Sequence, residues 1–433
     1  MAVPDLDLIT QAVQLQYEDF PYPPIPIDAP IKGFFPMDSY ILGQYARTRQ
    51  FHSPQDKRFL VAGCGTGHEL HGLVSSNPGY QEVIGIDISR KSIEIANQRI
   101  AYHQLSNATA QLGDILNPAT WPAGDFDMIC SYGVIHHTAD PLQSIRNLAA
   151  RLKKGGVMGL MLYNRSGRWQ VYRIRQAMAI LGIREPATEN NLKFVMSLLK
   201  DAGESTFLGI HYQANKEYYE KPENVVDNFF HAQDIPFDIG EIPEFLEKAG
   251  LEFLDVAPQR HYWDPKRLVS PTNKDFHDKF QTLSRIEQLT VQELLDPFYQ
   301  TQNIFWCCRQ GENQYFSGFD KEWFKQTQWR TNPMFLAHGG LEAMGDSFSF
   351  ESVYHDPHRI PKYIRKVDII WPLCQTPEFS IASTRYQVID LLLPLTNQPK
   401  LGAELLQDLD SEQQEHHLSL FKQWEKDRII LAC

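Results

Sequence analysis

A run of three glycines at alternate positions, in FLVAGCGTGHEL (residues 59–70), constrains this chain more than any other feature. An apolar segment of strand length leads into the glycines, and a helix-like segment follows them. Glycine adopts the backbone angles of a tight turn, and it lets the following helix begin close against a ligand. The free amide groups at the start of that helix suit an anionic or polar ligand. Turns also collect glycine for steric reasons alone, so the surrounding sequence has to decide whether this loop binds anything.

Short apolar segments and amphipathic helical patterns alternate over residues 57–163. FLVAG, EVIGIDI, ATAQLGDI, DFDMICSYGVI and VMGLMLY read as strands, and HELHGLVSS, RKSIEIANQRIAYHQ and PLQSIRNLAARLKKGG read as helices. Strands separated by helices in this order predict an α/β protein with a parallel sheet that has helices on both faces. Gly155 and Gly156 are expected to end the last of these helices just before the next strand.

The remaining sequence divides the chain into three parts. Helical patterns from Arg168 to Leu181 and from Leu192 to Ala202 precede a Tyr- and Asn-rich stretch at 211–234 with few structural signals, so we predict a helical insertion at about 166–235. A helix at 273–295 and a strand in QNIFWCC follow, and this strand is expected at an antiparallel edge. We predict an N-terminal arm or lid at 1–50, a main domain at 51–310, and a small, mostly helical or winged-helix-like accessory module at 311–433.

Composition excludes several classes of partner. A net charge of −12 argues against a broad surface for nucleic acid or anionic membrane. Apolar runs stay short of the ~20 residues of a membrane span, and the N-terminal residues do not resemble a secretory signal, so a cytoplasmic location is expected. The six cysteines form no CxxC pair, which predicts free thiols and no metal site.

Two acids follow the glycine loop at the ends of the next two predicted strands. Asp87 comes twenty residues after Gly67, where a carboxylate can accept both hydroxyls of a ribose. Asp114, in GDIL, is placed to accept from the exocyclic amine of an adenine. Either acid alone is better explained as a helix cap or turn residue. Three such elements in order, each at the carboxyl end of a strand, favour a nucleoside site instead.

Together, AGCGTG, GIDIS, GDIL, SYGVIHHTADP and LKKGGVMGLMLYN resemble the class I S-adenosylmethionine-dependent methyltransferases over residues 57–310. The resemblance implies a Rossmann-like, seven-stranded sheet whose last strand is antiparallel, with S-adenosylmethionine as cofactor. A nicotinamide cofactor fits less well, because its fingerprint is GxGxxG and this loop is GxGxG. The resemblance implies cofactor binding by Gly63, Cys64, Gly65, Gly67, Asp87, Ile88, Asp114, Ile115 and Tyr132.

A narrower resemblance involves YEDFPYP near the N-terminus. Combined with the motifs above, it is similar to bacterial methyltransferases that carry C-terminal regulatory or winged-helix-like modules, some of which look like protein methyltransferases. The chain departs from their pattern where Asn164 is followed by RSGR, so the identity of the substrate does not transfer.

The chemistry follows from the cofactor, since a sulfonium methyl is already an activated electrophile. The protein mainly holds an acceptor in line with it and excludes water, and the acceptor decides whether a base is needed. His136 and His137, after the fourth strand, are candidates for that base, with loop structure or cofactor contact as the alternatives. Tyr163 and Asn164 end the fifth strand and are candidates to hydrogen-bond the acceptor, with strand capping as the alternative.

Two further segments are expected near the acceptor. Tyr17, Phe20 and Tyr22 lie in a stiff, proline-rich arm that either covers the sulfonium through cation–π attraction or anchors the arm to the core. The stretch 211–234 is expected to bind the acceptor, because long insertions at this edge usually serve function. Its His211 and His231 are expected to be solvated or packed rather than metal ligands.

The leading hypothesis is methyl transfer to a nitrogen or oxygen of a protein side chain, because residues 311–433 add more surface than a metabolite needs. A small-molecule methyltransferase is the first alternative, and a non-catalytic nucleoside-binding scaffold is the second. A homodimer remains open.

Overall fold

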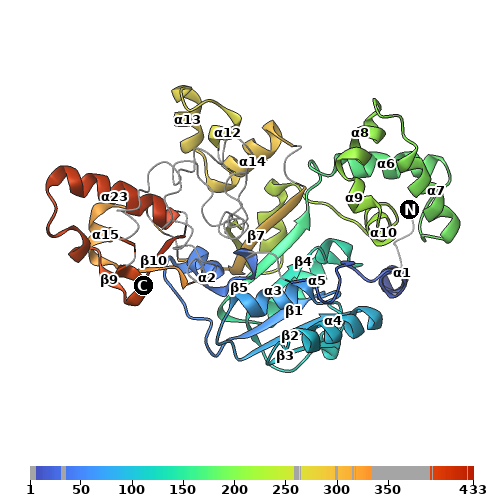
Figure 1. Cartoon of the computed structure of the whole chain (residues 1–433), viewed down its shortest axis with the longest axis horizontal. Coiled ribbons are helices and arrows are strands. Elements are labelled where there is room, and N and C mark those ends of the chain that lie inside the picture. Colours follow the sequence, from blue (N-terminus) through green and yellow to red (C-terminus); the bar gives the residue numbers. More distant parts are fainter. Residues whose placement is uncertain are drawn as a thin grey trace.

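The computed structural model describes residues 6–30, 36–257, 263, 265–297, 301–314, 316, 318–333, 391–392, 394–426 and 428–433. Its centre is a seven-stranded sheet in the order β3-β2-β1-β4-β5-β7-β6, flanked by helices (Figure 1). The sheet confirms the predicted α/β class and the methyltransferase-like architecture. Its strands are β1 (Arg58–Ala62), β2 (Glu82–Asp87), β3 (Ala108–Leu112), β4 (Phe126–Tyr132), β5 (Leu152–Tyr163), β6 (Leu251–Val256) and β7 (Gln302–Arg309).

The last strand of the sheet is antiparallel, as predicted, but it does not lie at the edge. β7 pairs in antiparallel fashion with β5 on one side and with β6 on the other. Its six central residues are buried, whereas the middle of β6 is only half-buried. The continuous apolar run in QNIFWCC is therefore typical of an interior strand, and β6 takes the edge.

Side chains of each central strand alternate between two apolar layers. In β1, Leu60 belongs to one buried cluster, while Phe59 and Val61 belong to another. Leu60 shares its cluster with residues of α5 (Pro141–Ala150), α11 (Ile242–Glu247) and α14 (Arg285–Leu295). The opposite layer takes residues from α2 (Tyr40–Thr48), α3 (His68–Ser76) and α4 (Arg90–Tyr102). The sheet is thus covered on both faces, and its strand ends are the open edge.

Two predicted helix boundaries are wrong. β5 begins at Leu152, so the glycine pair lies inside the strand, where Gly155 has φ +74° and the pairing with β4 is irregular. A strand can absorb such a residue as a bulge, so the pair does not end the helix. The predicted helix at 273–295 is two helices, α13 (Lys274–Gln281) and α14, because Ser284 and Glu287 form a capping box that starts the second one.

The insertion folds into five helices with an apolar core of its own. They are α6 (Trp169–Ile180), α7 (Glu189–Lys200), α8 (Phe207–Ala214), α9 (Lys216–Tyr219) and α10 (Pro222–Phe229). Val195, Tyr219 and Phe230 are among the buried residues of this core. The stretch 211–234, in which few structural signals were expected, is therefore largely helical, and its Tyr212, Tyr219, Phe229 and Phe230 pack in this core.

A second sheet lies at the other end of the molecule from the insertion (Figure 1). Its three strands, in the antiparallel order β10-β8-β9, are β8 (Gln328–Thr331), β9 (Lys400–Leu401) and β10 (Ile430–Ala432). Trp329, Phe421 and Trp424 pack there in one cluster with Tyr45 of α2 and Trp306 of β7. The helices of this part are α15 (Lys321–Gln326), α22 (Pro394–Asn397), η7 (Glu404–Leu406) and α23 (Ser411–Lys426).

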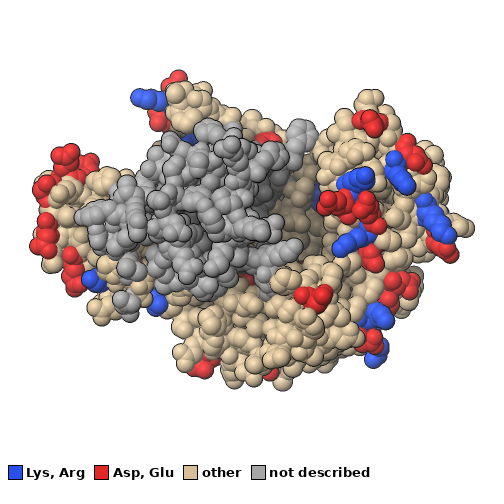
Figure 2. Space-filling view, viewed as in Figure 1, with Lys and Arg blue, Asp and Glu red and all other residues tan. Residues whose placement is uncertain are grey.

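The remaining elements are short, apart from the N-terminal helix α1 (Leu6–Asp19), and comprise η1 (Pro36–Asp38), η2 (Pro118–Thr120), η3 (Ile135–His137), η4 (Ile239–Glu241) and α12 (Pro265–Leu268). Among the described helices, none combines the length and the apolar character that crossing a membrane requires. Over the insertion, Lys and Arg side chains are interspersed with Asp and Glu in the view of Figure 2.

Candidate active site

A cavity of about 300 Å³ lies at the carboxyl ends of the parallel strands. This is the edge at which open α/β sheets bind their ligands. Its walls come from the loops after β1, β2, β3 and β4, from the N-terminal arm and from α10 of the insertion. The residues used below that line it are Tyr17, Tyr22, Gly63, Gly65, Glu69, Asp87, Ile88, Asp114, Ile115, Tyr132, His137, Tyr163 and Asp227.

The glycine loop after β1 needs glycine for both conformation and space. Gly63, Gly65 and Gly67 have φ angles of +79°, +48° and +84°, in the left-handed region. A Cβ at Gly63 would overlap the side chain of Val134, and one at Gly65 would overlap the carbonyl oxygen of Tyr22. The backbone is therefore held against the arm and the cavity with no room for a side chain.

Asp87 and Asp114 both line the cavity, with Ile88 and Ile115 beside them. The carboxylate of Asp87 accepts hydrogen bonds from the amide of Gly65 at 2.8 Å and from the amide of Ser89 at 2.9 Å. Burial raises the pKa of Asp87, and these amides oppose the rise. Asp87 thus fixes the loops after β1 and β2 relative to each other at the place where the sequence predicts ribose binding.

Four of the predicted site residues do not line the cavity. Cys64 is fully buried, and Gly67 caps α3 and packs against Ala96. His136 is buried too, where its Nδ1 accepts from the amide of Tyr163 at 3.4 Å, so it supports Tyr163 from behind. The fourth is Asn164.

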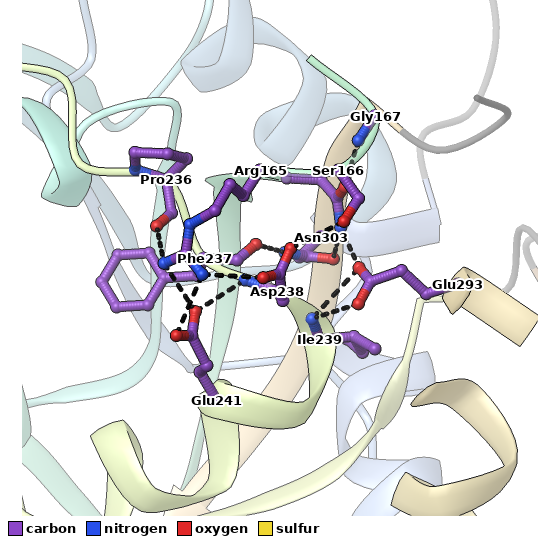
Figure 3. A network of polar contacts seen from close by, with 11 residues as sticks. Arg165, Ser166, Gly167, Pro236, Phe237, Asp238, Ile239, Glu241, Glu293 and Asn303 are labelled. Carbon is purple, nitrogen blue, oxygen red and sulfur yellow. Dashed lines mark hydrogen bonds and ion pairs between the residues drawn. The ribbon is translucent and has the colours of Figure 1, made fainter. Parts of the chain in front are cut away.

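The side chain of Asn164 takes part in a buried polar network. Its amide group donates to Glu293 and to Oδ1 of Asn303, the latter at 3.0 Å, and its oxygen accepts from the amide of Gly167 at 2.6 Å. Figure 3 shows Asn303, Glu293 and Gly167 in this network, with Glu293 accepting from the amide of Ile239. We therefore do not carry Asn164 into the proposed machinery.

The same network anchors the start of the insertion. Arg165 forms ion pairs with Asp238 at 2.7 Å and with Glu241 at 2.9 Å (Figure 3). These contacts tie the end of β5 to η4, so the chain that leaves β5 towards the insertion is held at a fixed position beside the cavity.

A cluster of polar side chains forms the end of the cavity that faces the insertion. The hydroxyl of Tyr163 donates to Oδ2 of Asp227 at 3.1 Å, and the guanidinium of Arg168 lies 3.6 Å from the centroid of the Tyr163 ring. The ring of His137 stacks on that of His231, with centroids 3.6 Å apart. We call Tyr17, His137, Tyr163, Asp227 and His231 the polar end.

The backbone of Gln233 sets the tautomers of the two stacked histidines. Its carbonyl oxygen lies 2.7 Å from Nδ1 of His137 and can only accept, so this Nδ1 carries a proton. Its amide donates to Nδ1 of His231 at 3.2 Å, so that nitrogen is bare. Neutral His231 therefore carries its proton on Nε2 and donates it to the hydroxyl oxygen of Tyr17 at 2.9 Å, whereas Nε2 of His137 keeps a free lone pair.

Burial decides the charges at the polar end. It lowers the pKa of His137 and lowers that of His231 well below its usual value, so both rings are neutral at pH 7. Burial also raises the pKa of Asp227, and the nearby His137 and Arg168 oppose the rise. Nε2 of His137 is buried and has no hydrogen-bond partner among the described residues.

Ligand atoms of His137, Asp227 and His231 lie within 4.8 Å of one another. A metal ion would need the lone pairs of both imidazoles to converge on one point. The two rings are stacked at an interplanar angle of 20°, so their lone pairs lie in nearly parallel planes and do not meet. The arrangement suits hydrogen bonding with a small polar group.

Sequence reasoning missed two of the acids that line the cavity. Glu69 lies in the first turn of α3, directly after the glycine loop, and burial raises its pKa to about 7. Only its place at a helix start after a binding loop marks it in the sequence. Asp227 falls within the stretch predicted to bind the acceptor, but nothing in the sequence separates it from the other polar residues there.

The comparisons agree with this geometry. A family model described as a methyltransferase domain matches residues 54–249. Residues 54–249 form a class I S-adenosylmethionine-dependent methyltransferase domain. Its cofactor is accordingly S-adenosylmethionine.

Among relatives of this methyltransferase, an uncharacterized protein of Synechococcus sp. is 29% identical over 306 residues, which are 67% of this chain and 70% of that protein. The ubiquinone biosynthesis O-methyltransferase of Vibrio parahaemolyticus is 27% identical over 40% of this chain and 75% of its own length. The structure of PKMT2 from Rickettsia typhi shares the fold with a TM-score of 0.53 at 17% identity, covering 72% of this chain and 59% of that one. PKMT2 has also been solved in complex with AdoHcy.

Proposed function

We propose that this methyltransferase transfers the methyl group of S-adenosylmethionine to a nitrogen or oxygen of a protein side chain. The proposal rests on one observation, the polar end that meets the cofactor cavity at Tyr163, His137 and Asp227. Bound S-adenosylmethionine supplies an activated methyl group, so an acceptor atom at this end needs only to be oriented and, where it carries a proton, deprotonated.

The size of the cavity favours a slender acceptor. At about 300 Å³ the cavity is at the lower limit of pockets that hold one organic ligand. The cofactor occupies most of such a volume, and the remainder suits the end of a side chain better than a bulky ring system. Of the residues that line the cavity, none belongs to the small three-stranded sheet, so the acceptor contacts the arm, the strand ends and the insertion.

The N-terminal arm closes the cavity over the loops that hold the cofactor. The carbonyl oxygen of Tyr22 accepts from the amide of Thr66 at 3.1 Å, and that of Pro23 accepts from its hydroxyl at 2.8 Å. The carbonyl oxygen of Tyr17 accepts from the hydroxyl of Ser89 at 3.1 Å. An arm bonded to both loops excludes water from the reacting groups, and its tyrosine rings line the cavity where they can face the sulfonium cation.

Exposed apolar side chains on the insertion support a protein as the molecule that carries the acceptor. Ile180 is 87% exposed, and Leu181, Phe194, Phe207 and Ile210 are exposed as well. Large apolar side chains left exposed on a surface can mark where a protein docks. The insertion also supplies Asp227 to the cavity, so one unit would bind the protein and place its side chain.

A small-molecule acceptor is the second candidate. Its support is the match over 40% of the chain to enzymes named ubiquinone biosynthesis O-methyltransferases, whose name refers to an oxygen on a small molecule.

Methyl-labelled S-adenosylmethionine separates these functions. The full chain is incubated with the label and a cell extract, and the extract is then fractionated by size before and after protease treatment. Label that is found on macromolecules before protease treatment and on small fragments after it supports a protein acceptor. Label that is found on small molecules before protease treatment contradicts a protein acceptor. Binding of the cofactor without any transfer would favour the scaffold. The Asp87→Ala variant, which lacks the predicted ribose acceptor, is the negative control.

A further inference from the structure

We propose that the acceptor is a primary amine, which binds as an ammonium ion to Asp227 and loses a proton to Nε2 of His137. This inference rests on the proposed methyl transfer at the polar end and names the chemical class of its substrate. An amine on a lysine side chain and an amine on a small molecule share this chemistry.

The hydrogen-bonding groups left over at the polar end are acceptors. Nε2 of His137 is a bare, buried lone pair with no partner among the described residues. Asp227 accepts one hydrogen bond, from Tyr163, and a carboxylate has room for about four. An unpaired acceptor that is buried costs free energy, so the group that completes this site has to bring hydrogen-bond donors.

Charge and rings favour a cation. Asp227 lies fully buried in a wall that also contains the rings of Tyr17, Tyr22 and Tyr163, whose faces attract positive charge. The guanidinium of Arg168 lies over Tyr163 and donates to the side-chain oxygen of Asn228 at 3.0 Å, so it forms no direct ion pair with Asp227. An ammonium ion offers three donors and one positive charge, which match the free lone pair, the carboxylate and the aromatic wall.

Other acceptor classes fit this site less well. A carboxylate would be repelled by Asp227 and would bring no donors. An alcohol or a phenol brings a single O–H, which can satisfy either His137 or Asp227 but leaves the other buried acceptor unpaired.

The tautomer set by Gln233 makes His137 suited to accept the proton. Because Nδ1–H of His137 is held by the carbonyl oxygen of Gln233, Nε2 is the only nitrogen that can take a proton, and burial keeps the ring neutral beforehand. The N–H bond of the ammonium breaks, and its proton moves to Nε2. The freed nitrogen lone pair then bonds the methyl carbon while the carbon–sulfur bond breaks and its electron pair stays on sulfur. The products are a protonated methylamine, S-adenosylhomocysteine and imidazolium.

Several charged groups surround this base and set its response to pH. Asp227 reaches it from α10, Arg168 from the start of α6, and His231 and Asp234 from the segment after α10. Arg175 of α6 is paired with Asp234 at 3.3 Å, and His136 adjoins the ring within η3. Only His137 among them combines a bare nitrogen with a place in the cavity wall.

The test uses the full chain, methyl-labelled S-adenosylmethionine and a cell extract in two portions, one with its amines blocked by acetylation. The proposal expects label only in the untreated portion, recovered after acid hydrolysis as an N-methylated amine. N-methyl-lysine in the macromolecular fraction identifies a protein acceptor, and an N-methylated small molecule identifies the other source. Base-labile methyl esters or O-methyl ethers would overturn the amine and leave methyl transfer standing. No transfer in either portion, with S-adenosylhomocysteine still bound, would sink the proposed function itself.

Variants then test the two residues. Asp227→Asn is expected to lower kcat/KM by ~10- to 100-fold through loss of the charged hydrogen bond. His137→Gln is expected to lower kcat by ~10²- to 10⁴-fold and to remove the acidic limb of the pH profile. Both should bind S-adenosylhomocysteine normally. If Asp227→Asn no longer binds S-adenosylhomocysteine, the Tyr163→Phe variant is used in its place. This variant removes only the hydroxyl that orients the carboxylate of Asp227, and it is expected to raise KM. His277→Gln, on exposed α13, is the matched histidine control and should act like the parent chain. If the pH profile of His137→Gln is the same as that of the parent chain, His137 is not the base.

Discussion

Glu69 is expected to bind the ammonium group on the methionine part of the cofactor. Four acids among the described residues line the cavity: Asp87 and Asp114 are predicted to bind ribose and adenine, Asp227 belongs to the polar end, and Glu69 is the fourth. S-adenosylmethionine has one further cationic group besides the sulfonium, and Glu69 lies directly after the glycine loop that is expected to hold that part of the molecule. The nearby guanidinium of Arg99 donates to backbone carbonyl oxygens of Thr66, Pro26, Ile27 and Ile25, so it leaves this carboxylate free to pair with the ligand.

The Glu69→Gln substitution keeps the shape of the side chain and removes its charge. A hydrogen bond to a charged group contributes about 1.5–3 kcal/mol, so S-adenosylhomocysteine should bind ~10- to 150-fold more weakly. Burial raises the pKa of Glu69 to about 7, and binding of the ammonium requires the ionised form. The affinity of the parent chain should therefore fall about tenfold between pH 8 and pH 6, because the carboxylate is about one-tenth ionised at pH 6. In Glu69→Gln this part of the pH dependence should disappear.

Isothermal titration calorimetry measures both effects, with 5′-methylthioadenosine as the control ligand. This nucleoside has the same adenine and ribose but lacks the amino-acid part, so contributions from Asp87 and Asp114 cancel in the comparison. Glu69→Gln should leave its affinity unchanged. An equal loss of affinity for both ligands would mean that Glu69 supports the loop and does not contact the ammonium. No loss for either ligand would refute the placement altogether.

Three other predictions follow from the same contacts. Asp87→Ala should abolish measurable binding of S-adenosylhomocysteine and of 5′-methylthioadenosine in the same calorimeter. The variant lacks the predicted ribose acceptor, and the amides of Gly65 and Ser89 lose their hydrogen-bond partner. Unchanged affinity would mean that Asp87 does not contact the cofactor. Asn164→Ala should lower the free energy of unfolding, measured in urea, by about 2–4 kcal/mol, because it unpairs buried polar groups of the network in Figure 3. The affinity for the cofactor should stay the same. A variant that is stable but inactive would instead support a catalytic role for Asn164. The stability of the parent chain relative to His137→Gln should fall as the pH drops below about 6.5, because the buried neutral histidine has a pKa below that of the unfolded chain, so that the unfolded state binds more protons there. Carboxylates with raised pKa values, such as Glu69, have the opposite effect but are common to both chains; a constant difference in urea midpoint between pH 7 and 5.5 would contradict this.

The cofactor half of the site was predictable from the sequence because its parts are local. Gly63, Gly65, Asp87 and Asp114 each lie within three residues of a strand end, and parallel strands bring their carboxyl ends to one edge whatever the loops contain. The order of strands and helices is enough to place them together. Cys64 and Gly67 are in the same loop but point into the core or cap a helix, a difference that depends on the backbone angles of single residues.

The acceptor half was not predictable, because it depends on contacts between distant segments. The hydroxyl of Tyr17 meets His231, which lies 214 positions later, and that of Tyr163 meets Asp227 after 64 positions. No periodic pattern links such pairs. The place of β7 in the sheet has the same origin, since its pairing partner β6 precedes it by a long segment that includes the described helices α12, α13 and α14.

His136 and His137 are adjacent and of the same residue type, but their hydrogen-bond partners give their rings different tautomers. Both are buried neighbours in η3, and either one fits a catalytic pattern. The backbone of β5 donates to Nδ1 of His136, which leaves its proton on Nε2 and uses the ring as a support for Tyr163. The carbonyl oxygen of Gln233, supplied by the insertion, instead accepts a hydrogen bond from Nδ1–H of His137, which leaves Nε2 without a proton at the cavity wall. A main-chain carbonyl from a different segment thus decides which of two adjacent rings presents a bare nitrogen to the cavity. If His137 is the base, as proposed, replacing the insertion is expected to change the acceptor chemistry without touching the cofactor loops.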